Sequence, residues 1–203
     1  MNEPLKFLYL LDLVGTAAFA ASGAWAAVRR HMDLFGILVL GVVTAVGGGT
    51  LRDILLGDIP PFSLQNEVYL YIAIVTSLVV FVWRNRFKAF ERPLLYFDAI
   101  GLGTFVVIGT TKAIEYRLGF LGTVLMGVMT ATAGGVIRDI LANQVPLILR
   151  RDIYASACVA GSVLLIVLLQ IGTPRLAALA SAAITVIAVR LAAIHFGWSL
   201  PKS

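Results

Sequence analysis

The sequence predicts an all-α polytopic membrane protein, in which two inverted three-helix repeats are followed by one further helix. Two observations lead to this class. Of the 203 residues, 60% are hydrophobic and 13% are charged, which leaves too little polar surface to cover a water-soluble globule. In addition, residues 44–57 read TAVGGGTLRDILLG and return as TATAGGVIRDILAN at 130–143. The chain is therefore built from two related halves.

Seven apolar segments are long enough to cross a bilayer, at about 20 residues per crossing. They leave little chain for a soluble domain, so residues 1–203 are predicted to form a single transmembrane domain. The predicted spans are Leu5–Val28, Leu34–Leu56, Asn66–Trp83, Leu94–Thr111, Gly119–Ala142, Ile153–Ile171 and Leu176–Phe196.

The internal repeat has an offset of 86 residues and aligns without a gap. Chance similarity between apolar helices does not align Gly, Asp, Arg and Pro repeatedly in one register, so an internal repeat is predicted. The repeats are expected at about 5–83 and 92–171, with the last helix at about 176–196 outside them. Since three spans separate equivalent points, the second copy must be inverted, as in many proteins that move solutes. The register pairs Asp12 with Asp98, Gly48-Gly49 with Gly134-Gly135, Arg52-Asp53 with Arg138-Asp139, and Pro60 with Pro146.

The basic residues serve as a topology signal. The net charge of +5 comes from residues spread over short loops, which does not favour nucleic-acid binding. By the positive-inside bias, the N-terminus is outside and the C-terminus cytoplasmic, in a plasma or inner membrane. One set of span ends carries Arg29, Arg30, Arg84, Arg86, Lys88, Arg92, Arg150, Arg151 and Lys202, and the other carries Lys6, Lys112, Arg117 and Arg175.

Glycines recur in the middle of the second and fifth spans. Glycine weakens a helix interior by about 1 kcal/mol relative to alanine, so these spans are predicted to be kinked or locally unwound. Unwinding would free backbone carbonyls one turn earlier, which could replace part of a cation's water shell. The alternative is close packing of two helices. The hinge residues are Gly47, Gly48, Gly49, Gly134 and Gly135, and the carbonyls are those of Thr44, Ala45, Thr130 and Ala131.

Charged residues follow the glycines within the same spans. Charge at this depth is unfavourable unless it is paired or hydrated. Neighbours on a helix point about 100° apart, so pairing across the pseudo-twofold axis is expected rather than pairing within one Arg-Asp dipeptide. Arg190 in the seventh span either snorkels or holds the bundle together. The predicted buried charge network comprises Arg52, Asp53, Arg138, Asp139, Asp12 and Asp98, in which the last two either neutralise an arginine or contact a solute.

The sequence does not predict an enzyme. No set of nucleophile, base and orienting residue recurs, and His31 and His195 have no metal-ligand company. The stretch GGGTLRD lacks the strand and the Gly-Lys-Ser/Thr ending of a phosphate loop. No metal and no cofactor are expected.

The motifs GGGTLRD at 47–53 and AGGVIRD at 133–139, in a seven-span chain of about 200 residues, resemble the prokaryotic TRIC family. These are the trimeric intracellular cation channels. The resemblance implies a homotrimer with one pore in each subunit, bounded by the kinked second and fifth helices and passing monovalent cations such as K⁺. The Lys-Glu-Val signature of the animal members is missing here, so their lipid regulation is not expected.

Two other functions stay open at the level of sequence. Two arginines near a cation path raise its electrostatic barrier unless aspartates neutralise them. The alternative is a transporter of a small zwitterionic solute such as glycine, with Arg or a helix N-terminus on the carboxylate and Asp or free carbonyls on the ammonium group. A non-transporting membrane scaffold would explain packing glycines but not buried charges.

Overall fold

The computed structural model describes residues 3–87, 93–150 and 153–198. Within these ranges it contains ten α-helices and no strand. Three of the helices (α3, α5 and α8) have only four residues. The helices are α1 (Glu3–Arg29), α2 (Leu34–Leu56), α3 (Phe62–Gln65), α4 (Val68–Val82), α5 (Arg84–Phe87), α6 (Pro93–Glu115), α7 (Phe120–Leu141), α8 (Leu147–Arg150), α9 (Ala155–Gln170) and α10 (Arg175–Phe196).

Five of these helices (α1, α2, α6, α7 and α10) are long and apolar enough to cross a membrane. The third and sixth predicted spans fall on two shorter apolar helices, α4 with 15 residues and α9 with 16. At 1.5 Å per residue these are about 22–24 Å long, less than the roughly 30 Å of a hydrocarbon core. The four-residue helices α3 and α8 precede them, one in each half.

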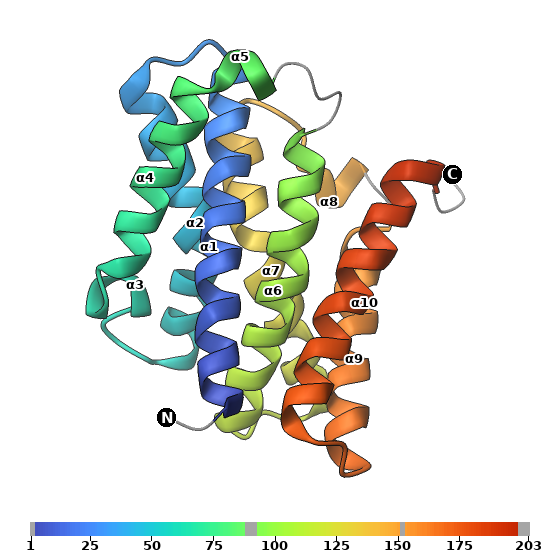
Figure 1. Cartoon of the computed structure of the whole chain (residues 1–203). Helices are drawn as coiled ribbons and strands as arrows, with labels where there is room; N and C mark the ends of the chain where they lie inside the picture. The colour runs from blue at the N-terminus through green and yellow to red at the C-terminus, as the bar shows by residue number, and fades with distance from the viewer. Residues whose placement is uncertain (1–2, 88–92, 151–152, 199–203) are drawn as a thin grey trace.

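Helices α1 and α6 pack side by side in the centre and run in opposite directions (Figure 1). Helix α2 packs on α1, α7 packs on α6, and α2 and α7 also contact each other. Helix α4 covers α1 and α2, and α9 and α10 cover α6. The equivalent helices of the two halves therefore occupy equivalent, inverted places. The two ends of the chain lie at opposite ends of the bundle, and which end faces the cytoplasm stays a prediction.

The turns between the long helices follow from local sequence. Asp33 precedes α2, and its carboxylate accepts a hydrogen bond from Gly36 N at 2.7 Å, which satisfies an N-terminal N–H. Gly57 ends α2 in the left-handed conformation, at φ 74°, where a side chain would be strained. The predicted linker at 84–92 forms α5 as far as Phe87, and the rest of it lies outside the described residues.

Candidate functional site

Helices α2 and α7 cross where their glycines lie. A Cβ atom on Gly48 would lie under 3.0 Å from the carbonyl oxygen of Thr130, and one on Gly134 would be equally close to that of Thr44. Both helices are continuous through their glycines. The predicted local unwinding is therefore wrong, because these glycines let two intact backbones approach. Whether the helices also bend stays a prediction.

The other predicted hinge and carbonyl positions have separate surroundings. The Thr44 and Thr130 hydroxyls donate to carbonyls of their own helices, Leu40 at 2.6 Å and Met126 at 2.7 Å. Ala45 and Ala131 are buried in the hydrophobic core. A Cβ on Gly47 would meet the Ile137 side chain at 3.1 Å, one on Gly49 would meet the Phe62 ring, and one on Gly135 would meet polar groups.

Each of the two motif arginines, Arg52 and Arg138, pairs with the aspartate that follows it. Arg52 Nε lies 2.8 Å from Asp53 Oδ1, and Arg138 Nε lies 2.9 Å from Asp139 Oδ1. The expectation that pairing within one dipeptide is disfavoured is therefore wrong. Neighbouring Cβ atoms do diverge on a helix, but the long arginine side chain folds back far enough to reach the next carboxylate.

The second oxygen of each of these aspartates holds the chain that follows the helix. Asp53 Oδ2 accepts from Phe62 N at 2.9 Å, and Asp139 Oδ2 accepts from Leu147 N at 2.7 Å. Phe62 and Leu147 begin α3 and α8. Each aspartate therefore joins an arginine to the first N–H of a short helix, which explains why an Arg-Asp-Ile-Leu motif recurs shortly before a proline in both halves.

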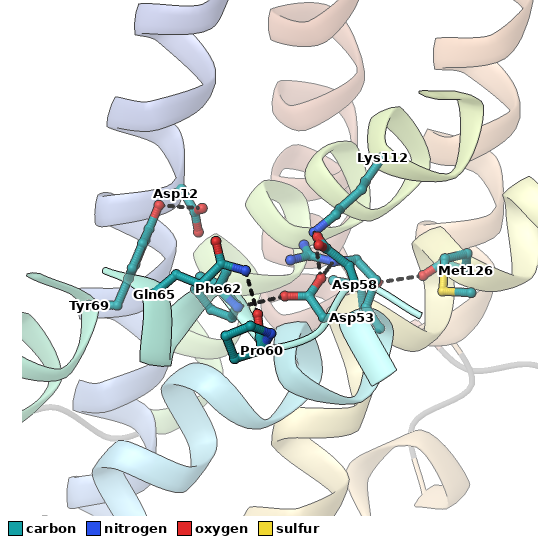
Figure 2. A network of polar contacts seen from close by, with 11 residues as sticks. Asp12, Asp53, Asp58, Pro60, Phe62, Gln65, Tyr69, Lys112 and Met126 are labelled. Atoms are coloured by element: carbon teal, nitrogen blue, oxygen red, sulfur yellow. Dashed lines mark hydrogen bonds and ion pairs between the residues drawn. The ribbon is translucent and has the colours of Figure 1, made fainter. Parts of the chain in front are cut away.

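In the first half, Arg52 and Asp53 belong to a wider group that we call the first charge cluster: Arg52, Asp53, Asp58 and Lys112. Lys112 Nζ, from the end of α6, lies 2.6 Å from Asp53 Oδ1 and also binds Asp58 Oδ2 (Figure 2). Arg52 also lies over the Phe62 ring, 5.4 Å from its centroid. The Lys112 side chain is 20% exposed and that of Asp58 33%, so the edge of this cluster lies at the surface of the single chain.

In the second half, Arg138, Asp98 and Asp139 form the second charge cluster. Arg138 Nη1 lies 2.6 Å from Asp98 Oδ1 and also donates to the Ser22 hydroxyl. Both Arg138 and Asp98 are completely buried. Asp98 therefore forms an ion pair with a buried arginine, Arg138, as one of its two predicted roles requires. Asp98 and Lys112 are 14 residues apart on α6, or about 21 Å at 1.5 Å per residue, so the two clusters lie toward opposite ends of the bundle.

Within the described residues, Asp12 accepts a side-chain hydrogen bond from a tyrosine and not from an arginine. Its Oδ2 accepts from the Tyr69 hydroxyl at 3.0 Å (Figure 2). The Tyr69 ring packs on Phe62 with 4.7 Å between centroids. In the second half, Tyr154 lies beside Asp98 in the corresponding place. The two halves therefore share an Asp–Tyr contact. It joins α1 to α4 in the first half, and α6 to the start of α9 in the second half.

Arg190 connects α10 to the second half. It is 2% exposed, its Nη1 donates to the Ile153 carbonyl, and its guanidinium carbon lies 4.8 Å from the centroid of the Tyr154 ring. The residue therefore holds the bundle together, which was one of its two predicted roles, and does not snorkel to the surface.

Six residues that contribute to these contacts were not predicted from the sequence, and the reason is clear for Lys112 and for the two tyrosines. Lys112 was counted only as a charge at the end of a span. Its position in the sequence does not show that its side chain points into the bundle. The tyrosines are related by an offset of 85 rather than 86, because Pro60-Pro61-Phe62 has one residue more than Pro146-Leu147. An ungapped comparison cannot pair them. The six are Ser22, Asp58, Phe62, Tyr69, Lys112 and Tyr154.

These features define the class: a helical membrane protein of two inverted, similar halves, each with glycine-mediated helix packing and a buried Arg–Asp pair. The family model described as "Glycine transporter" matches residues 9–85 and 95–170, one segment in each half. The chain belongs to this family, which includes the prokaryotic TRIC channels.

Relatives agree over nearly the whole length. A UPF0126 membrane protein of Vibrio cholerae is 42% identical over 197 residues, covering 97% of this chain and 82% of the relative. The UPF0126 inner membrane protein YadS of Escherichia coli K12 is 43% identical over 196 residues, covering 96% and 95%.

Solved structures share the fold. A TRIC channel orthologue from Rhodobacter sphaeroides superposes with a TM-score of 0.90 at 36% identity, covering 95% of this chain and 99% of that one. A structure that describes conductance through TRIC cation channels superposes with a TM-score of 0.87 at 41% identity, covering 96% of both chains. These relatives are channels and membrane proteins rather than enzymes.

Proposed function

We propose that this protein is a monovalent cation channel that passes K⁺, with a conduction path between α2 and α7 in each subunit of a homotrimer. The solved relatives that support the proposal are described as cation channels, and one of them as trimeric. Many large apolar side chains are exposed on the single chain, among them Phe35 at 74% and Tyr71 at 60%. Membrane lipid and neighbouring subunits would cover them.

The observation that carries the proposal is the neutralisation of both arginines. Arg52 and Lys112 face two carboxylates, those of Asp53 and Asp58. Arg138 alone faces two, those of Asp98 and Asp139. In neither cluster do cations outnumber carboxylates, so the arginines raise no net barrier against a permeating cation. Each arginine also pairs through its Nε with the aspartate that follows it, which argues against a role as an anchor for a substrate carboxylate.

We propose that the conduction path passes through the crossing of α2 and α7. The Thr44 and Thr130 carbonyls lie at the α2–α7 crossing, where the opposite glycine covers each of them. A cation that passed between these helices would need the crossing to separate, after which the same carbonyls would be available as ligands. Gly48 and Gly134 would then mark the position at which the conduction path is closed.

A transporter of a small zwitterion such as glycine is the second candidate, because the matching family model carries that description. The two functions respond in opposite directions to Arg52→Gln. In a channel the substitution leaves the local potential more negative, so K⁺ flux persists or rises. In a transporter it removes a carboxylate anchor, and a charged hydrogen bond of about 1.5–3 kcal/mol corresponds to a roughly tenfold to hundredfold weaker affinity.

The test is purified protein in liposomes, assayed for both K⁺ flux and glycine uptake. The matched control is Arg175→Gln, which removes an exposed arginine whose ion pair with Glu115 has side chains 43% and 54% exposed. We expect K⁺ flux in all three proteins. Saturable glycine uptake that weakens in Arg52→Gln but not in Arg175→Gln, without K⁺ current in any of them, would overturn the channel proposal.

A further inference from the structure

Asp12 and Asp98 occupy equivalent places in the two halves but differ in burial and in partners. Asp98 Oδ1 lies 2.6 Å from Arg138 Nη1, and both of these side chains are completely buried. Asp12 is only partly buried, and its Oδ2 accepts from the Tyr69 hydroxyl (Figure 2). Among the described residues no hydrogen bond or ion pair reaches Asp12 Oδ1, and this atom is not enclosed. The Asp12 carboxylate therefore presents one oxygen at the surface of the single chain.

This carboxylate lies well inside the span formed by α1. Asp12 is six residues beyond Lys6, or about 9 Å along the helix. Phe19, seven residues further on, lies beside the crossing of α2 and α7, since a Cβ atom on Gly134 would be 3.6 Å from its ring. An ionised side chain at such a depth is unfavourable against lipid and typically faces water or a partner. Asp12 Oδ1 thus requires water or a cation beside it.

The charges of the first half leave Asp12 without a counter-ion of its own. The first charge cluster has two cations and two carboxylates, so Asp12 adds one negative charge. Arg52 and Lys112 both attract Asp12, but each is already paired with Asp53.

The second half has a further cation in the corresponding place. Arg190 of α10 lies over the ring of Tyr154, the tyrosine beside Asp98, with 4.8 Å from the guanidinium carbon to the ring centroid. Helix α10 lies outside the repeat, so the first half has no equivalent of Arg190. The place beside Asp12 and Tyr69 therefore suits a cation that the chain itself does not supply.

The available ligands favour a weakly held monovalent cation. Asp12 offers one carboxylate oxygen, and the Tyr69 hydroxyl, which donates its proton to Oδ2, can still accept. Divalent cations typically need several oxygen ligands, and no group of three or more His, Cys, Asp or Glu in the described part of the chain could hold a metal ion. Weak binding is also what conduction requires, because the ion must leave again.

We propose that Asp12, oriented by Tyr69, forms a binding site for a monovalent cation beside the crossing of α2 and α7. The site concentrates K⁺ on that side of the conduction path, and in this respect it rests on the proposed channel function. A unit charge in contact with a cation raises the local cation concentration about fivefold even in bulk water. The second half has no such site, because Arg138 occupies Asp98 Oδ1.

Rubidium soaks of crystals of the full-length protein test the site directly, since Rb⁺ substitutes for K⁺ and has an anomalous signal. We expect an anomalous peak beside Asp12 Oδ1 in the wild type and none there in Asp12→Asn. Asparagine has the shape of aspartate and can still accept from Tyr69, so the variant should fold. The control is Glu3→Gln, which removes a carboxylate of the same helix whose side chain is 81% exposed. The peak should persist in this control.

K⁺ flux in liposomes gives a second readout. At low K⁺ concentration the flux of Asp12→Asn should fall about fivefold, because the local enrichment of cations is lost. The loss should shrink at high K⁺ concentration, since dissolved ions screen the charge. Glu3→Gln should change the flux much less at either concentration.

A wild-type map without Rb⁺ beside Asp12 would overturn the site, as would Asp12→Asn flux equal to that of Glu3→Gln at low K⁺ concentration. Wild-type protein without K⁺ flux contradicts the channel proposal instead, and the Rb⁺ map then decides on the site by itself.

Discussion

Gly48 of α2 lies against the carbonyl oxygen of Thr130 on α7, too close for any side chain to intervene. The reciprocal contact of Gly134 with Thr44 makes the crossing symmetric. Because both sides of each contact include backbone, neither can move aside by changing a rotamer. The separation of the two helices is therefore fixed by the lack of two Cβ atoms.

Replacing Gly48 or Gly134 by Ala should force the helices apart. Overpacking a tight contact typically destabilises by about 1–3 kcal/mol, and the double variant should lose more. The measurement is thermal unfolding in detergent, together with K⁺ flux in liposomes, which we expect to change in both variants. Gly122→Ala, on the same helix but in open packing, is the control. If the double variant matches wild type in both assays, the crossing is looser than described.

The two motif arginines should differ in their effect on stability. Arg138 is completely buried and pairs with both Asp98 and Asp139. Arg138→Gln should therefore cost about 3–5 kcal/mol, as for other buried pairs that lose one partner. Arg52→Gln should cost less, because Lys112 still binds Asp53. Unfolding of the two variants by heat checks this order, and an equal loss would contradict it.

Lys112 should matter more than a lysine at the end of a span ordinarily does. Lys112→Met leaves Asp58 without its ion pair and Asp53 with Arg52 alone. We expect lower thermal stability and, in a cation channel, flux that persists or rises because the local potential becomes more negative. The control is Asp58→Asn, which removes only one of the two Lys112 partners and should be milder. A Lys112→Met protein as stable as wild type would show that the pairs contribute little.

Arg190 should stabilise the protein although it lies outside both repeats. Arg190→Met removes a charged hydrogen bond to Ile153 and the contact with the Tyr154 ring. The loss should be at least about 1.5 kcal/mol, the lower range for a charged hydrogen bond. Arg175→Gln, an exposed pair, should lose no more than about 1 kcal/mol. Similar melting temperatures for the two variants would argue against a bundle-holding role.

The predicted orientation can be tested with single cysteines. The native Cys158 is completely buried and should not react. Arg86→Cys, on the basic linker side, should be labelled by a membrane-impermeant maleimide only after the cells are opened. Tyr116→Cys, at the other end of α6 and 42% exposed, should be labelled in intact cells. The reverse pattern would invert the topology.

Much of the fold was predictable because it rests on signals that survive in a single sequence. Apolar length and a register of glycines, aspartates and arginines gave the helices and the inverted halves. The places of α4 and α9 were predicted, but their shortness was not. The predicted spans ran on through Asn66, Glu67 and Trp83 around α4, and through Ile153, Tyr154 and Ile171 around α9. Hydropathy does not show where the backbone hydrogen bonding of a helix stops.

Five members of the two charge clusters were predictable from the sequence, and their contacts were less so. Arg52, Asp53, Arg138, Asp139 and Asp98 do form buried ion pairs, but their partners depend on side-chain reach, which helical angles alone do not determine. The role of Gly48 could not be separated from unwinding, because a glycine weakens a helix and permits close packing through the same missing Cβ. Only the neighbour across the crossing distinguishes the two.

Lys112 has no equivalent in the first half of the chain, so the two halves are not interchangeable. At the repeat offset its counterpart is Ala26, so two copies of the first half, assembled as an antiparallel dimer, would have no lysine to bind Asp53 and Asp58. Arg190 likewise comes from a helix that belongs to neither copy. A protein made of two identical halves would have only the motif arginines to pair with these carboxylates. The two halves therefore differ in the residues that hold their charge clusters, and cutting the chain between the repeats should not yield two interchangeable pieces.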